Sequence, residues 1–298
     1  MFRHAIVGVD GRPSGRDAVA LARLLVASQE RVRLTLAYVY RLAPIDGASA
    51  FADTVRDDWT RLLEGERDAT GVDAELLSVA ASSVGRGLHH LAETHDADLL
   101  TVGSCARGFA GRVLVGNDTR ASLSGAPCAV AIAPLGYAET PRGIATIGVG
   151  YDGSPESEAA LALARDLAAH HGAAVRALEI VQIPALAYAG FVGVVWGDAF
   201  QTMLTDAQER MAALEGVEGE AGLGLAGEEL AAFGAGVDLL IVGSRGYGPV
   251  RRLMLGSTSE HLASHARCPL LVLPRQATGG PDPQLSAGDE DRTAPAPV

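Results

Sequence analysis

The sequence predicts an α/β protein with two doubly wound domains, each built on a parallel five-stranded sheet, because the chain repeats itself once. Residues 7–11 (VGVDG) return as residues 149–153 (VGYDG), a shift of 142. Residues 98–104 (DLLTVGS) return as residues 238–244 (DLLIVGS), a shift of 140. The repeat unit is therefore a whole domain, unlike solenoid repeats, whose periods are about 20–50 residues. Short β-branched runs also alternate with longer helical patterns, which favours a parallel sheet covered by helices on both faces.

In the first copy we expect strands and helices in strict alternation. Residues 5–9 form the first strand, because they are short, apolar and closed by Asp10-Gly11. Residues 16–27 follow as an amphipathic helix. The later segments are strands at 32–40, 74–80, 99–102 and 129–133, and helices at 51–66, 84–94 and 118–124.

The second copy repeats this order. Its strands are expected at 146–151, 175–181, 239–242 and 270–273, and its helices at 158–170, 200–215, 228–233 and 258–265. The segment 217–225 corresponds to the third strand but is rich in glycine, so we expect it to be shortened or lost. We place the domains at 1–140 and 141–275. The tail 276–298 has scarcely any apolar content and is expected to be disordered.

Composition narrows the class of protein. The formal net charge is −12, which argues against a general binder of nucleic-acid backbones, since such affinity comes largely from Lys and Arg. The three cysteines, Cys105, Cys128 and Cys268, lack the spacing of a disulfide framework or a zinc site. The first residues enter a strand without a signal-peptide stretch, so a cytoplasmic protein is expected. Residues 180–197 carry no charge, but the proline and glycines among them favour an apolar loop over a membrane span.

The most informative loop follows the fourth strand of the second copy. Gly243-Ser244-Arg245-Gly246 is followed by nine residues and then by Gly256-Ser257-Thr258. Glycine at a strand exit lets backbone amides approach a phosphate, and the free N–H groups at a helix start form an anion site. Ser257 and Glu260 have the spacing of a capping box, and Arg245 adds positive charge.

This spacing resembles the nucleotide loop of the universal stress protein family, and the resemblance extends over nearly the whole chain as a tandem pair. It implies binding of ATP, or of ADP or AMP, with Mg²⁺ as a candidate companion ion. Asp152 would lie on the adenine side, and Val181 would pack against adenine. The phosphate side would consist of Gly243, Gly246, Gly256, Ser257 and Thr258. The resemblance also implies that the last strands of the two domains pair, giving a pseudo-dimer.

The first copy departs from the family's loop at two positions. Ala106 replaces the second glycine, and Asn117 replaces the serine that opens the helix. Asp118 then places a carboxylate where a phosphate would lie. We therefore expect asymmetric binding, with the second domain as the main site. The weaker first-domain equivalents are Asp10, Val39, Gly103, Gly116 and Asn117.

Other motifs give weaker signals. Residues 222–227 spell a dinucleotide fingerprint, but no convincing strand is expected before them. No P-loop motif occurs. His261 and His265 have helical i, i+4 spacing without an evident third metal ligand, so no metal site is assigned.

Taken together, these patterns favour a stress-response sensor or regulator that binds an adenine nucleotide without dedicated catalysis. No catalytic residue is assigned, because no second carboxylate or histidine accompanies Asp152 in a motif. The alternatives are a slow ATP-cleaving or adenylating enzyme and a nucleotide-free interaction scaffold. The expected partners are a regulatory protein, with residues 185–195 as a candidate contact, and a second copy of the chain, but neither nucleic acid nor a membrane.

Overall fold

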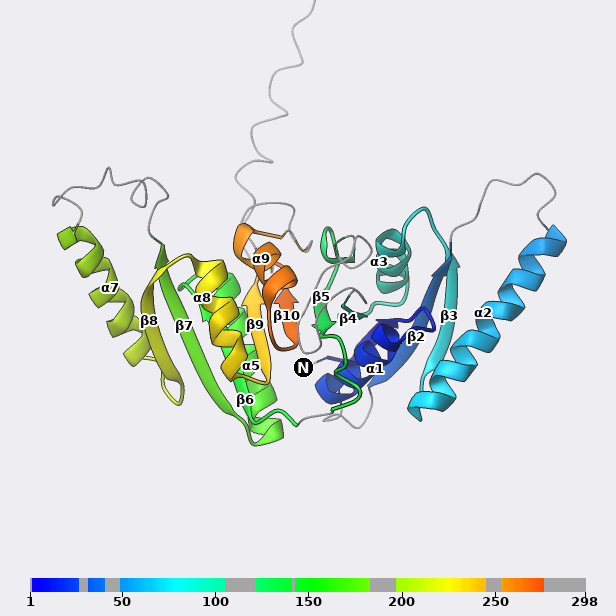
Figure 1. Cartoon of the computed structure of the whole chain (residues 1–298), viewed down its shortest axis with the longest axis horizontal. Coiled ribbons are helices and arrows are strands. Elements are labelled where there is room, and N and C mark those ends of the chain that lie inside the picture. Colours follow the sequence, from blue (N-terminus) through cyan, green and yellow to red (C-terminus); the bar gives the residue numbers. More distant parts are fainter. Residues whose placement is uncertain are drawn as a thin grey trace, which may run out of the picture.

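A computed structural model of the chain describes residues 2–26, 32–40, 49–104, 120, 122–140, 143–182, 197–244, 253 and 255–275. The first repeat contains β1 (His4–Gly8), α1 (Pro13–Val26), β2 (Arg33–Tyr40), α2 (Ser49–Thr70), β3 (Glu75–Ala80), α3 (Val84–Thr94), β4 (Leu99–Gly103) and β5 (Ala129–Ala133) (Figure 1). The second repeat contains β6 (Thr146–Tyr151), α5 (Pro155–His171), β7 (Ala174–Gln182), α7 (Gly197–Ala212), β8 (Glu218–Gly224), α8 (Ala226–Phe233), η2 (Gly234–Gly236), β9 (Leu239–Gly243), α9 (Ser257–His265) and β10 (Leu270–Leu273).

The strands form one sheet of ten, in the order β3-β2-β1-β4-β5-β10-β9-β6-β7-β8. Each half is parallel, and the two halves meet where β5 and β10 pair antiparallel. This confirms the expected pairing of the last strands, through which the two five-stranded sheets form one sheet of ten. The halves share one continuous sheet because two short, wholly buried edge strands satisfy each other's backbone groups.

The junction has nearly two-fold symmetry. Ala131 pairs with Leu271, and these two residues occupy equivalent positions in the two repeats, 140 apart. On either side, Val130 faces Val272 and Ile132 faces Leu270. A pseudo-two-fold axis therefore passes through the pair of Ala131 and Leu271.

Each face of the sheet carries its own layer of buried side chains. Residues of α1, α2, α5 and α7 pack on one face, and residues of α3, α8 and α9 pack on the other. Both layers run through both repeats, and Figure 1 shows α2 and α7 beside the two ends of the sheet. The alternation of buried and half-buried residues along β7 follows from the two-residue period of a strand.

The strand β8 was expected to be shortened or lost, and that expectation is wrong. It spans seven residues and pairs with β7 from Glu218 to Gly224. Its glycines have a packing reason: a Cβ on Gly219 would lie 2.5 Å from the Met211 carbonyl oxygen of α7. The fingerprint at 222–227 therefore begins within a strand, since its first three residues belong to β8, and it runs into α8.

Two other expectations concern segments that are only partly described. Of the expected helix at 118–124, the described residues show one helical turn, closed by a hydrogen bond from Ser124 N to the Arg120 carbonyl. The apolar segment 185–195 and the tail 276–298 lie outside the described residues. In the part of the chain that the structure describes, no helix has both the length and the apolar character needed to cross a membrane.

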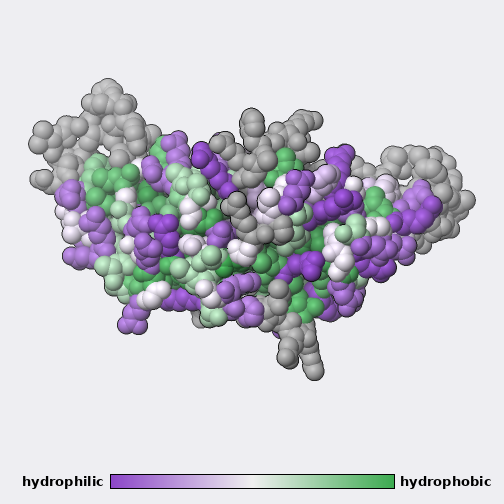
Figure 2. Space-filling view, turned by 60° about the horizontal axis from the view of Figure 1, so that its bottom comes forward, coloured by the Kyte–Doolittle hydropathy of each residue, from purple (hydrophilic) through white to green (hydrophobic). Residues whose placement is uncertain are grey.

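The surface carries both hydrophilic and hydrophobic residues. On the face shown in Figure 2, hydrophilic and hydrophobic residues are interspersed. Among the described residues, the exposed large hydrophobic side chains are Met203 on α7, and Leu223 and Leu225 at the end of the edge strand β8.

Candidate functional site

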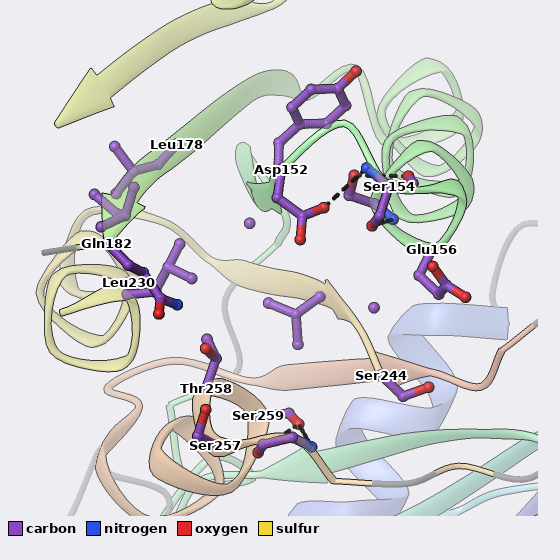
Figure 3. A pocket seen from close by; sticks show the side chains of 18 residues that line it. Asp152, Ser154, Glu156, Leu178, Gln182, Leu230, Ser244, Ser257, Thr258 and Ser259 are labelled. Carbon is purple, nitrogen blue, oxygen red and sulfur yellow. Dashed lines mark hydrogen bonds between the residues drawn. The ribbon is translucent and has the colours of Figure 1, made fainter. Parts of the chain in front are cut away.

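A cavity of about 200 Å³ opens at the carboxyl ends of β6, β7 and β9 (Figure 3). The first residues of α5 and α9 and one side of α8 complete its wall. β6 lies between β9 and β7, so the chain leaves it in one direction and returns on the other side. Such a topological switch point is where open α/β sheets bind ligands.

The turn between β6 and α5 fixes Asp152 at the rim. Its Oδ1 accepts a hydrogen bond from Ser154 N at 3.0 Å, and Ser154 Oγ in turn accepts one from Ser157 N at 3.2 Å. Gly153 has φ +74, which favours glycine, and Pro155 opens α5. Figure 3 shows the Asp152 carboxylate directed toward the open space of the pocket.

The start of α9 lies across the pocket from this turn. Gly256 is the N-cap, and its N–H donates to Ser259 Oγ at 2.9 Å. Ser257 and Thr258 occupy the first two helical positions and line the cavity. The first N–H groups of a helix have no partner within it, so this end can receive an anion. The described residues supply no other partner for these two amides.

The expected capping box of Ser257 and Glu260 is wrong. The helix begins one residue earlier relative to that motif, so Gly256 is the cap and Ser259 closes the turn. Glu260 instead forms an ion pair with Arg120 of the first repeat, at 2.8 Å.

An apolar wall forms the other side of the pocket. Leu178 and Ile180 come from β7, Leu230 from α8 and Val242 from β9. Gln182 stands at the open end of this wall. The pocket thus has an apolar side and a polar, amide-rich side, which suits a ligand with a flat apolar group and an anionic group.

Val181, predicted to pack against adenine, is not among the residues that line the pocket. Side chains alternate across a strand, and only the even-numbered residues of this part of β7 line the pocket, whereas Val181 is buried on the opposite face. Strand register shows the reason. Val7 pairs with Leu36 and Val149 pairs with Ala177, so the repeat shift falls to 141 in this strand. The true counterpart of Val39 is therefore Ile180.

Gly243 has a packing role that the sequence did not indicate. A Cβ at this position would lie 2.6 Å from the Glu156 Cβ, because α5 begins directly against the strand end. The equivalent Gly103 is crowded in the same way, since a Cβ there would overlap the Ser14 carbonyl oxygen of α1. Both glycines thus permit close contact between helix and strand.

Two polar groups at the strand exit were missed. The Ser244 side chain lines the pocket and is buried, yet its Oγ has no hydrogen-bond partner among the described residues. Glu156 also lines the pocket, with its side chain 11% exposed and its Oε1 3.8 Å from Arg275 Nε. The repeated GS dipeptide at 103–104 and 243–244 was a signal for Ser244, whereas Glu156 belongs to no motif.

Two of the described first-repeat equivalents, Val39 and Asp10, contact neighbouring residues of their own repeat. A Cβ on Gly87 of α3 would lie 2.5 Å from Val39 Cγ1, so α3 covers that side chain closely. Asp10 is exposed, accepts a hydrogen bond from Arg12 N at 3.1 Å and forms an ion pair with the Arg12 side chain at 3.6 Å.

Four predicted site residues belong to segments that the structure does not describe. Arg245 and Gly246 in the second repeat, and Gly116 and Asn117 in the first, lie outside the described residues. Asymmetric binding therefore stays a prediction. Among the described side chains there is no group of three or more that could hold a metal ion. His261 and His265 stack with ring centroids 4.1 Å apart.

The fold is that of a tandem α/β protein, with a pocket at the strand ends of its second repeat. Both repeats match the model of the Universal stress protein family, over residues 1–134 and 143–274. The chain belongs to this family, whose members are stress-response proteins.

Individual relatives agree with the tandem architecture. A universal stress protein of Mycobacterium tuberculosis is 26% identical over 289 residues, which cover 90% of this chain and 99% of that protein. A solved universal stress protein of Archaeoglobus fulgidus shares the fold, with a TM-score of 0.63 at 16% identity, and the match covers 91% of this chain and 98% of that one. A further solved universal stress protein is in complex with cAMP; it is 30% identical, has a TM-score of 0.29, and the match covers 34% of this chain and 76% of that one.

Proposed function

We propose that this protein binds ATP, ADP or AMP in the pocket of the second repeat and acts as a cytoplasmic sensor or regulator in stress adaptation, without dedicated catalysis. The observation that carries the proposal is the buried Ser244 hydroxyl, which lines the cavity and has no partner among the described residues. Burying a hydroxyl without a hydrogen bond costs free energy, so a ligand oxygen at this point would satisfy it.

The pocket's chemistry fits the parts of an adenine nucleotide. The apolar wall of Leu178, Ile180 and Leu230 suits a purine ring. The amides of Ser257 and Thr258, at the positive end of α9, suit phosphate oxygens. Asp152 stands at the rim, where a carboxylate accepts hydrogen bonds from ribose hydroxyls or from an exocyclic amine.

Two carboxylates in the pocket are candidate ligands for Mg²⁺. Glu156 and Asp152 both line the cavity, and carboxylates with phosphate oxygens are the ligands that Mg²⁺ prefers. Bound together with a nucleotide, the ion would neutralise the charge of Glu156 and of the phosphates. We include Mg²⁺ as an optional companion of the nucleotide.

The decisive experiment has two parts. The purified protein is denatured and the released small molecules are identified, and the native protein is then titrated calorimetrically with ATP, ADP, AMP, cAMP and GTP, with and without Mg²⁺. We expect an adenine nucleotide to bind with a clear preference over GTP. Leu230→Asp, which puts a charge into the apolar wall, should abolish the signal, and Leu223→Asp on the exposed end of β8 is the matched control.

The same preparation separates the alternatives. Release of ADP, AMP or pyrophosphate from ATP, lost in Leu230→Asp, would favour an enzyme. Protein that carries no nucleotide and shows no heat and no thermal shift with any of these compounds would overturn the proposal in favour of an interaction scaffold.

A further inference from the structure

Leu253, which precedes α9 in the second repeat, is hydrogen-bonded to the first repeat. Leu253 lies three residues before Gly256 and is fully buried. Its N–H donates to the Ala126 carbonyl oxygen at 2.8 Å, and its own carbonyl accepts from Gly125 N at 2.8 Å. Both partners belong to the first repeat, so a pair of backbone hydrogen bonds ties the end of the second repeat's loop to the first repeat.

An ion pair links the first turn of α9 to the first repeat as well. Glu260, in the first turn of α9, forms the ion pair with Arg120 at 2.8 Å. Arg120 and Ala126 lie at the two ends of one short segment of the first repeat, which the structure describes at residues 120 and 122–126. The start of α9 is thus held on both sides by this segment, which we name the anchor segment.

The residues that the anchor segment contacts lie on either side of three pocket residues in the sequence. Gly256, Ser257 and Thr258 line the cavity and lie between the two anchored residues, Leu253 and Glu260. Leu253 also packs in the buried layer that contains Leu123 of the anchor segment and Leu262 of α9. The direction of the amides at the helix start therefore depends on the contact between the repeats.

We propose that the first repeat is the positioning half of the second repeat's ligand site. The anchor segment fixes the start of α9 in the orientation that receives the anionic group of the ligand. Ligand binding and contact between the repeats then stabilise each other, since a coupling free energy between two events acts in both directions. The inference rests on the proposed function for the identity of the ligand, but not for the anchoring itself.

Reversing one charge, or exchanging both charges, tests the ion pair between Arg120 and Glu260 in the full chain. Arg120→Glu and Glu260→Arg each put like charges together, whereas the double variant restores an opposite pair. We expect each single variant to weaken ATP binding about threefold or more, as measured by calorimetry, and the double variant to recover to within about twofold of wild type. Arg86→Glu, an exposed change on α3, should leave the dissociation constant unchanged.

A second pair of variants tests the buried contact. Leu253→Ala should weaken ATP binding about tenfold, because the helix start loses its support, although Leu253 does not line the pocket. Leu88→Ala removes an equally buried leucine of the first repeat and should lower stability without changing affinity.

A readout without ligand separates anchoring from nucleotide binding. In ligand-free protein, hydrogen exchange at the amides of Leu253 and Glu260 should be faster in both single charge variants and return to the wild-type rate in the double variant. Unchanged exchange and affinity in the single variants, or no recovery in the double variant, would overturn the anchoring role. Exchange that behaves as expected in a protein that binds no nucleotide would support anchoring and refute the proposed function.

Discussion

Ser104 and Ser244 directly follow equivalent strands, β4 and β9, yet only the Ser104 hydroxyl has a partner in the described structure. Ser104 Oγ donates to the Ala133 carbonyl oxygen at 2.8 Å. Ser244 keeps the equivalent backbone bond, from its N–H to the Leu273 carbonyl at 2.9 Å, but its Oγ is unpaired among the described residues and lines the pocket. The same residue is thus structural in one repeat and available to a ligand in the other.

Alanine at these two positions should separate stability from binding. Ser244→Ala removes an unpaired buried hydroxyl, so the free energy of unfolding should stay constant or rise by up to about 1 kcal/mol, while ATP affinity falls about fivefold to tenfold. Ser104→Ala should lower stability by about 1 kcal/mol and leave affinity unchanged. Urea unfolding and calorimetry measure the two effects, and identical behaviour of the two variants would contradict the assignment of Ser244.

Neighbouring residues of β7 should behave in opposite ways. Ile180→Ala shortens the apolar wall and should weaken ATP binding severalfold with little loss of stability, because Ile180 is only half-buried. Val181→Ala opens space on the buried face and should cost about 1–2 kcal/mol of stability with affinity retained. The dissociation constants and unfolding midpoints of both variants check this. A larger affinity loss in Val181→Ala would reinstate the residue that the sequence favoured.

Stability should fall in alkaline solution. Burial is the main cause that raises the pKa of Cys128 and of Cys268 from about 9 to about 12. Between these values the unfolded chain loses thiol protons that the folded chain keeps, so the free energy of unfolding decreases as pH rises through this window. The slope should approach one proton per thiol. Urea titrations at several pH values between about 8 and 10.5 measure it, and Cys128→Ala with Cys268→Ala should flatten the curve; an unchanged slope would refute the thiol origin.

The segment after β5 depends on one buried carboxylate. Asp17 on α1 is 1% exposed and accepts hydrogen bonds from Gly136 N at 2.9 Å and Ala138 N at 2.8 Å. Asp17→Ala leaves both amides without that acceptor and should lower the free energy of unfolding by about 2–3 kcal/mol. Asp17→Asn keeps one acceptor oxygen and should lose less. Equal losses in both variants, measured by urea unfolding, would show that the acceptor itself contributes little.

The sequence predicted the duplication and most elements, because internal similarity and apolar periodicity are both local signals. Asp152, Gly256, Ser257 and Thr258 line the pocket as expected, since Asp152 directly follows a strand and the other three open a helix, both in recognisable motifs. The pairing of β5 with β10 also came from the sequence, through the family resemblance.

The errors have physical causes that the sequence does not display. Val181 was assigned through the family resemblance, at a shift of 142 from Val39, but the shift is 141 between β2 and β7, and one residue reverses the face of a strand. β8 was expected to be shortened or lost because glycine has low strand propensity. Hydrogen bonds to β7 and the close approach of α7 nevertheless stabilise this strand. Leu230 reaches the pocket from the side of α8 and Glu156 from the first turn of α5, so only the packed structure brings them together.

The pseudo-two-fold axis through Ala131 and Leu271 has a consequence for how the duplicated gene has diverged. An axis of this kind brings positions that lie close to it against their own counterparts, and Arg120 and Glu260 are such counterparts, 140 residues apart. Two copies of the first repeat joined in this way would oppose arginine with arginine, and two copies of the second would oppose glutamate with glutamate. At this contact the two halves are therefore complementary to each other, and neither could replace the other without opposing like charges.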